Sequence, residues 1–115
     1  MTYNQFMKFI ELGNYTKQLN ELMDDASYKK LQSHLIENPK SGKFILGSKY
    51  LRKIRWQSKG KGKRGGSRHI YYFYDKEPVF FMLFTYGKDE LEDLTKREAR
   101  SLDSLVEQLI KEYRS

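Results

Sequence analysis

The run from Val79 to Tyr86 is the most hydrophobic stretch of this chain and the strongest constraint on its fold. It reads Val-Phe-Phe-Met-Leu-Phe-Thr-Tyr and contains no charged residue. Alternating polar and apolar residues would indicate a strand with one buried face, whereas a continuous apolar run of this length predicts a strand buried on both faces. We therefore expect this segment to be the central strand of a sheet.

The other segments predict a single small α+β domain that spans residues 1–115. An apolar strand is expected near 6–10, followed by a helical hairpin in which Asp24 and Asp25 separate the two helices and Pro39 ends the second. A three-strand antiparallel meander follows, with strands at 51–56, 69–74 and 79–86. Thr95 and Glu98 form a capping-box pattern, which predicts a closing amphipathic helix.

Composition excludes several classes of protein. The chain has no cysteine, which excludes disulfides, thiolate zinc sites and cysteine nucleophiles and makes a reducing cytosol the simplest setting. Its two histidines, His34 and His69, lie 35 positions apart and do not favour a metal site or a paired acid–base site. No segment has the pattern of a signal peptide or the ~20 apolar residues of a membrane span. We expect a cytoplasmic protein without a metal or small-molecule cofactor.

Positive charge is concentrated in one part of the chain. No acidic residue lies between Glu37 and Asp75, and this stretch holds eleven of the 22 Lys and Arg residues. The rest of the chain has eleven basic and fifteen acidic residues, so the net charge of +7 arises from this stretch alone. A local cationic stripe of this kind predicts an anionic partner such as a nucleic acid.

The predicted strands bring several of these cations together. Lys53 and Arg55 share one face of their strand, and Arg68 lies on the strand that follows. Like charges on paired strands repel by roughly 0.2–1 kcal/mol, a cost that a bound anion would remove. Further candidates for RNA or ribosome contacts are Arg52, Lys59, Lys61, Lys63, Arg64 and Tyr72, the last by stacking on an unpaired base. His69 and Trp56 are expected in the core.

A glycine-rich loop lies between the first two strands of the meander. Gly60, Gly62 and Gly65 match the spacing G-x-G-x-x-G, but a dinucleotide site needs that motif between a strand and a helix. Here it connects two antiparallel strands. The alternatives are a cationic loop that approaches phosphates and a solvated hairpin tip whose lysines protect the sheet edge.

Four short sequence blocks follow one another along the chain in an order that carries a family resemblance. They are Leu-Arg-Lys-Ile-Arg at 51–55, Gly-Lys-Gly-Lys-Arg-Gly-Gly at 60–66, Ile-Tyr-Tyr at 70–72 and Tyr-Gly-Lys at 86–88. In these blocks the chain resembles the RelE/HigB family of bacterial toxins, and it is most similar to the HigB-like branch. The resemblance implies a small RelE-like domain and a metal-independent mRNA interferase that cleaves translated messages in the ribosomal A site. It also implies two partners, a cognate antitoxin and mRNA on the ribosome with contacts to 16S rRNA.

The resemblance also implies site residues. The paired cations of the family match Lys53 and Arg55, its strand arginine matches Arg68, and its cation after the last strand matches Lys88. Where some members place a catalytic tyrosine this chain has Thr95, so no general acid is assigned. Arginines suit a phosphorane because they bind two oxygens and keep their proton. A lysine among other cations gives up its proton more readily, which makes Lys53 the candidate base.

The sequence is compatible with three other functions, one of which it disfavours. Related ParE-type proteins use the same fold to poison DNA gyrase. A non-catalytic RNA-binding module would need the cations only to hold phosphates. Binding to an anionic membrane is disfavoured, because the cations lie on strands and a loop rather than on an amphipathic helix.

Overall fold

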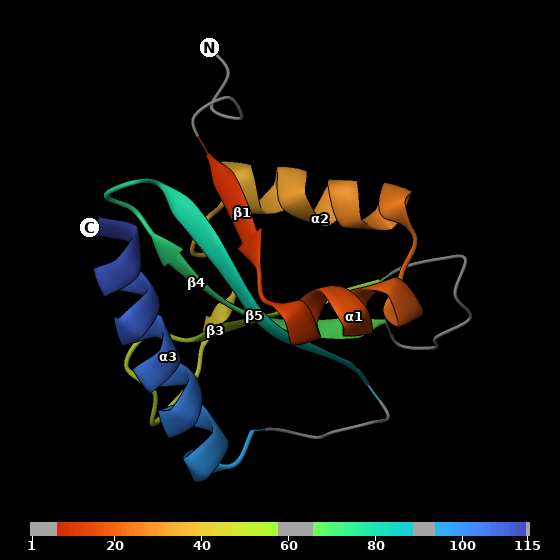
Figure 1. The fold of residues 1–115 in the computed structure, drawn as a ribbon. Coiled ribbons are helices and arrows are strands. Elements are labelled where there is room, and N and C mark those ends of the chain that lie inside the picture. Colours follow the sequence, from red (N-terminus) through yellow and green to blue (C-terminus); the bar gives the residue numbers. More distant parts are fainter. Residues whose placement is uncertain (1–6, 58–65, 89–93, 115) are drawn as a thin grey trace.

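The computed structural model describes residues 7–57, 66–88 and 94–114 (Figure 1). Within these ranges the elements are β1 (Lys8–Glu11), α1 (Gly13–Leu22), α2 (Asp25–Glu37), β2 (Lys43–Phe44), β3 (Arg52–Trp56), β4 (Ser67–Tyr74), β5 (Val79–Gly87) and α3 (Lys96–Arg114). The predicted α+β order is confirmed. The short strand β2 was not predicted, because both of its residues are exposed and carry no alternating pattern.

The strands form one mixed sheet in the order β1-β5-β4-β3-β2. The meander β3-β4-β5 is antiparallel as predicted, while β1 pairs with β5 in parallel. Every residue of β5 except Phe84 is buried, which confirms burial on both faces. It is also an interior strand, as expected, because β1 pairs with its outer side; the middle place of the five strands belongs to its neighbour β4.

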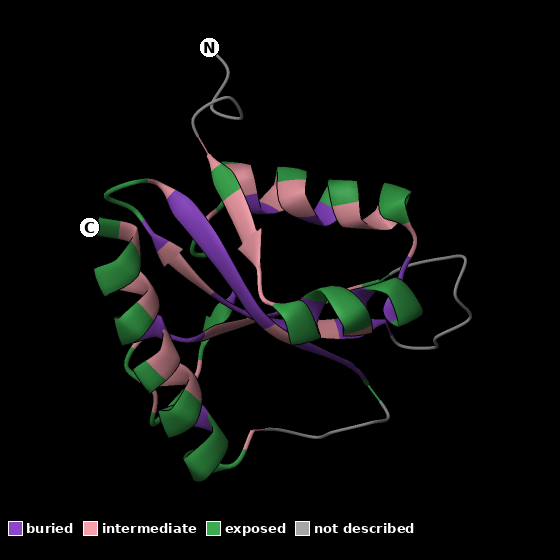
Figure 2. Cartoon of the chain, viewed as in Figure 1, coloured by how far each residue is buried: buried purple, intermediate pink, exposed green. Residues whose placement is uncertain are grey.

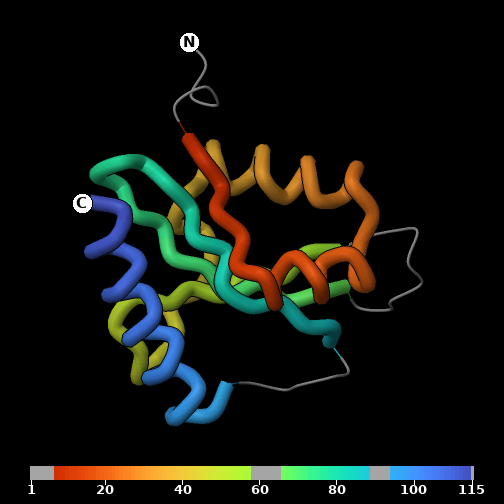
Figure 3. The backbone as a smooth tube through the Cα atoms, viewed as in Figure 1, coloured from red at the N-terminus to blue at the C-terminus, as the bar shows by residue number. Residues whose placement is uncertain are grey.

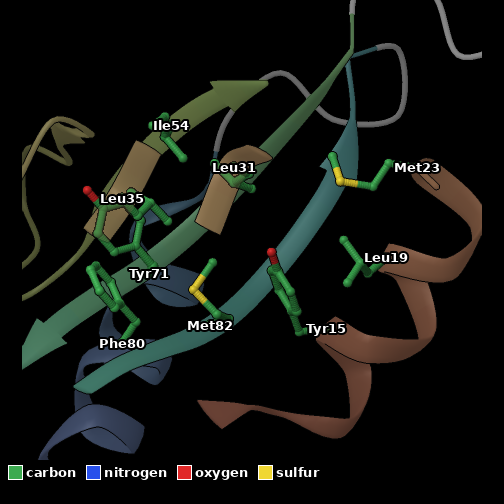
Figure 4. Close-up of a cluster of buried hydrophobic side chains, with 9 residues drawn as sticks. All are labelled: Tyr15, Leu19, Met23, Leu31, Leu35, Ile54, Tyr71, Phe80 and Met82. Carbon is green, nitrogen blue, oxygen red and sulfur yellow. The ribbon is translucent and has the colours of Figure 1, made fainter. Parts of the chain in front are cut away.

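Helices cover both faces of the sheet. The chain runs along α1 and returns along α2 on one face, while α3 lies across the other (Figures 1 and 3). Figure 2 shows that β5 is buried while the helices present exposed residues outward. The cluster under α1 and α2, drawn in Figure 4, consists of Tyr15, Leu19, Met23, Leu31, Leu35, Ile54, Tyr71, Phe80 and Met82. The cluster under α3 consists of Leu51, Ile70, Tyr74, Val79, Phe81, Leu83, Tyr86, Ala99 and Val106.

Helix caps form where the sequence predicts them. The Asp24 carboxylate accepts a hydrogen bond from the Ser27 amide at 2.9 Å, and interactions with the Ser27 side chain and then with this amide lower the pKa of Asp24. At the start of α3, Thr95 and Glu98 exchange side-chain hydrogen bonds with each other's backbone amides, at 2.8 and 3.1 Å. Both predicted helix starts are therefore confirmed.

The loop between α2 and β2 is tied to the sheet by Tyr71. The Tyr71 hydroxyl donates to the Pro39 carbonyl at 2.8 Å and accepts from the Gly42 amide at 3.0 Å. The Tyr71 ring occupies the space that a side chain at Gly42 would need. Burial raises the pKa of Tyr71, so this hydroxyl keeps its proton and both hydrogen bonds at neutral pH.

A buried polar group lies in the core beneath α1. The His69 ring is fully buried, with the Tyr15 hydroxyl 2.8 Å and the Thr85 hydroxyl 3.1 Å from Nδ1, and the Ser67 hydroxyl 2.7 Å from Nε2. Because burial disfavours a charged imidazole, the pKa of His69 falls to about 3. The prediction that His69 belongs to the core is confirmed.

Three Gly→Ala substitutions should distinguish two effects on the free energy of unfolding, namely an unfavourable backbone conformation and a steric collision. Gly66 has φ +73 and a side chain there would collide with the carbonyl group of Trp56, whereas Gly47 has φ +86 and open space. Gly66→Ala should lower the free energy of unfolding by more than about 2 kcal/mol, and Gly47→Ala by about 1–2 kcal/mol. Gly13→Ala, in α1 with open space, should raise it by about 0.4–1 kcal/mol. Urea unfolding measures all three, and equal effects at Gly66 and Gly47 would contradict the collision.

The buried imidazole should make the protein sensitive to acid. A histidine with a pKa near 6.5 when unfolded and about 3 when folded takes up its proton mainly on unfolding. Stability is then fully present above pH 6.5 and is lost as the pH falls from about 6.5 toward 3, by up to about 1.4 kcal/mol per pH unit. His69→Gln should remove this part of the slope in urea unfolding measured from pH 7 to 4.

The control for this measurement is His34→Gln, because His34 is only partly buried and lies on α2. This variant should keep the slope of the wild type. Parallel curves for wild type and His69→Gln would show that His69 does not cause the loss.

Candidate nucleic-acid interface

The strand register brings the predicted catalytic cations onto one face of the sheet. Arg55 on β3 lies opposite Arg68 on β4, and Arg68 lies opposite Tyr86 on β5. Lys53 lies opposite Ile70 in the neighbouring row. Directly paired residues project from the same face, and Ile70 packs under α3, so these side chains share the α3 face. We call Lys53, Arg55 and Arg68 the cationic cluster.

The cationic cluster is partly open to solvent. Arg55 is exposed, whereas Lys53 and Arg68 are half-buried, and Tyr86 beside Arg68 is only 2% exposed. Two guanidinium groups therefore project from directly paired positions, one of them against a buried aromatic residue. This arrangement suits a phosphate, which accepts two hydrogen bonds from each guanidinium and offsets the repulsion between them.

The backbone under Arg68 is held from the opposite face. The Thr85 hydroxyl donates to the Arg68 carbonyl at 2.8 Å and also contacts His69. Because successive residues of a strand face opposite sides, His69 lies in the core while Arg68 projects toward α3. Sequence reasoning placed His69 in the core but missed its hydroxyl partners, although Thr85 directly faces it in the sheet register.

Arg52 is not brought to the cationic cluster. Its guanidinium Nη1 donates to the carbonyls of Lys40 and Gly42 at 3.2 and 2.9 Å, and its charge lies 6.0 Å from the centre of the Phe44 ring. Alternation along β3 places Arg52 on the face opposite Lys53 and Arg55. In this structure Arg52 holds the loop before β2 and the edge of the sheet.

The other predicted contact residues lie in different surroundings. Tyr72 packs against Tyr50 and Tyr74, with ring centres 5.1 and 6.3 Å away, and burial raises its pKa. Lys88 is exposed directly after β5, and its amide donates to the Gly66 carbonyl at 3.3 Å, which places it near the start of β4. Four predicted cations lie outside the described residues: Lys59, Lys61, Lys63 and Arg64.

A groove of about 670 Å³ opens beside the cationic cluster, between the start of α2 and the end of β3. Arg55 contributes to this groove as well as to the cluster. The lining residues are Asp24, Ala26, Ser27, Lys30, Arg55, Trp56 and Gln57. Sequence reasoning did not find the groove, because its walls come from segments about 30 positions apart that meet only in the folded chain.

Metal-ligand clusters and membrane-spanning helices are both missing from the described residues. In the ranges 7–57, 66–88 and 94–114 no group of three or more His, Asp or Glu side chains could hold a metal ion. None of the three helices in these ranges is long and apolar enough to cross a membrane.

Comparison with known proteins identifies the fold. No protein-family profile matches this chain. Among solved structures, the free state of an E. coli toxin RelE variant, in which two arginines are replaced by alanine, is similar with a TM-score of 0.55 and 18% sequence identity. The match covers 81% of this chain and 93% of the RelE chain. The chain therefore has a RelE-like fold, as the sequence predicts, while its place in the HigB-like branch stays a prediction.

Proposed function

We propose that this protein is the toxin of a toxin–antitoxin system and that it cleaves translated mRNA in the ribosomal A site. The observation that carries the proposal is the convergence of Lys53, Arg55 and Arg68 on one face of a RelE-like sheet. A DNA-gyrase poison with this fold would not need three cations gathered on one face of the sheet. A small, cytoplasmic, ribosome-directed enzyme accounts for both the fold and the charge.

The chemistry needs only the RNA and protein side chains. The 2′-OH attacks the adjacent phosphorus, a base takes the 2′-OH proton, and the P–O5′ bond breaks. The products are a 2′,3′-cyclic phosphate and a 5′-OH, whose oxygen receives a proton. Arg55 and Arg68 neutralise the charge that develops on the phosphorane, and Lys53 accepts the 2′-OH proton. Lys88, at the end of β5, is the further cation of the proposed site.

The two proposed partners follow from the same charge distribution. A cognate antitoxin would cover the cationic cluster with an acidic or closely fitted segment. On the ribosome, cations outside the cluster would meet 16S rRNA phosphates, and such contacts weaken as the salt concentration rises.

Arg68→Ala should abolish the growth arrest that the wild type causes on induction in a bacterium. Removing the guanidinium takes away stabilisation of the phosphorane, which for a single electrostatic contact is worth about 10²–10³ in rate. Mapping of the 5′ ends of mRNA fragments should show cuts within translated regions for the wild type and none for the variant. Arg114→Ala removes an exposed arginine from the last position of α3 and should behave as wild type.

Two outcomes of this experiment would contradict the proposal. Growth arrest without cleaved messages would indicate gyrase or another target, and cleavage that persists in Arg68→Ala would remove Arg68 from the site. Thermal unfolding of each purified variant shows whether a loss of activity reflects a loss of folded protein.

Lys53→Ala should slow cleavage by 10²-fold or more while leaving RNA affinity within a few-fold. Loss of a general base lowers the rate of the chemical step, whereas one phosphate contact contributes only part of the binding energy. Single-turnover cleavage on programmed ribosomes and binding of an uncleavable RNA measure the two quantities separately. Lys76→Ala, a cation in the turn at the other end of β4, is the control. A rate within a few-fold of wild type would exclude Lys53 as the base.

A further inference from the structure

The groove between α2 and β3 lies on the α2 side of the sheet edge, and the cationic cluster lies on the α3 side of the same edge. Arg55 lies opposite Arg68 in the sheet and also lines the groove. It can do both because β2 pairs only with Arg52 and Lys53. Beyond that point β3 has no partner strand on its outer side within the described parts of the chain. The exposed Arg55 therefore lies at an open sheet edge, between the cluster on one side and the groove on the other.

The groove combines a flat aromatic wall with positive charge. Trp56 and Ala26 supply apolar surface, and Lys30 and Arg55 supply two cations. The acidic member, Asp24, already accepts the Ser27 amide at 2.9 Å and is near Lys30. An apolar surface with surplus positive charge suits a nucleotide, which joins an aromatic base to an anionic phosphate.

The aromatic wall is held in place before any ligand arrives. The Trp56 indole Nε1 donates to the Ser27 carbonyl at 3.2 Å, and its ring lies 5.3 Å from the His34 ring. A side chain fixed in this way loses little conformational entropy when a base stacks on it. The volume of about 670 Å³ is within the roughly 300–1,000 Å³ of small-ligand sites.

We propose that this groove binds the unpaired nucleotide next to the one whose phosphate lies in the cationic cluster, so that single-stranded RNA crosses the open edge of β3 at Arg55. This inference rests on the proposed function, because it takes RNA as the ligand of the cluster. It adds a second subsite and gives Lys30, Trp56 and Gln57 roles in RNA binding.

Charge reversal on neighbouring lysines of α2 tests the proposal. Lys29 and Lys30 are both exposed, but only Lys30 is among the described residues that line the groove. The probe is a short single-stranded RNA with 2′-deoxy substitutions that prevent cleavage, and its affinity is measured by fluorescence anisotropy at fixed salt. Lys30→Glu should weaken binding at least 10-fold and Lys29→Glu no more than about 3-fold. Because both substitutions change the net charge equally, a larger loss at Lys30 reflects its place in the groove. Equal effects of the two substitutions would overturn the proposal.

Photocrosslinking provides a readout that does not depend on charge. A 4-thiouridine placed at successive positions of the same RNA should crosslink to Trp56 or Gln57 from one position next to the cluster-bound phosphate. Crosslinks that map only to the α3 face would overturn the subsite. If the RNA crosslinks in the groove but the message on programmed ribosomes is never cut, the subsite stands and the proposed cleavage fails. If the wild type and both lysine variants cut RNA equally well, cleavage stands and the subsite fails.

Discussion

The register of β4 between its two neighbours is the constraint on which both the core and the proposed site depend. Arg68 and His69 are adjacent in sequence, yet one projects toward α3 and the other is fully buried beneath α1. A slip of one residue would bury the guanidinium against Tyr15 and expose the imidazole. The buried hydroxyls of Tyr15 and Ser67, 2.8 and 2.7 Å from the ring nitrogens of His69, oppose such a slip, because they would lose these hydrogen bonds.

The same register keeps two like charges side by side. Arg55 and Arg68 are directly paired, so the folded state bears a repulsion that an uncharged pair would avoid. Functional sites commonly lower stability in this way, and the surrounding structure compensates. Here the compensation lies in the apolar clusters on both faces of the sheet, which hold the strands together behind the charges.

Features set by local sequence were predictable, and those set by distant contacts were not. Periodicity and capping residues such as Asp24 and Thr95 gave the helices, and alternation along β3 placed Lys53 and Arg55 on one face. Alternation also places Arg52 on the face opposite Lys53 and Arg55. The hydrogen bonds of Arg52 to the carbonyls of Lys40 and Gly42, however, depend on the loop conformation. The parallel pairing of β1 and the groove beside Trp56 each join distant segments, and no local pattern in the sequence encodes them.

The contact between Gly42 and Tyr71 links the evolution of two positions 29 residues apart. The Tyr71 ring fills the space beside Gly42, and its hydroxyl holds the backbone on both sides of that loop. A relative with a larger residue at the position of Gly42 must therefore carry a smaller one at that of Tyr71 and must anchor the loop by other means. We expect these two positions to covary among homologues, and chimaeras that exchange only one of them to fold poorly.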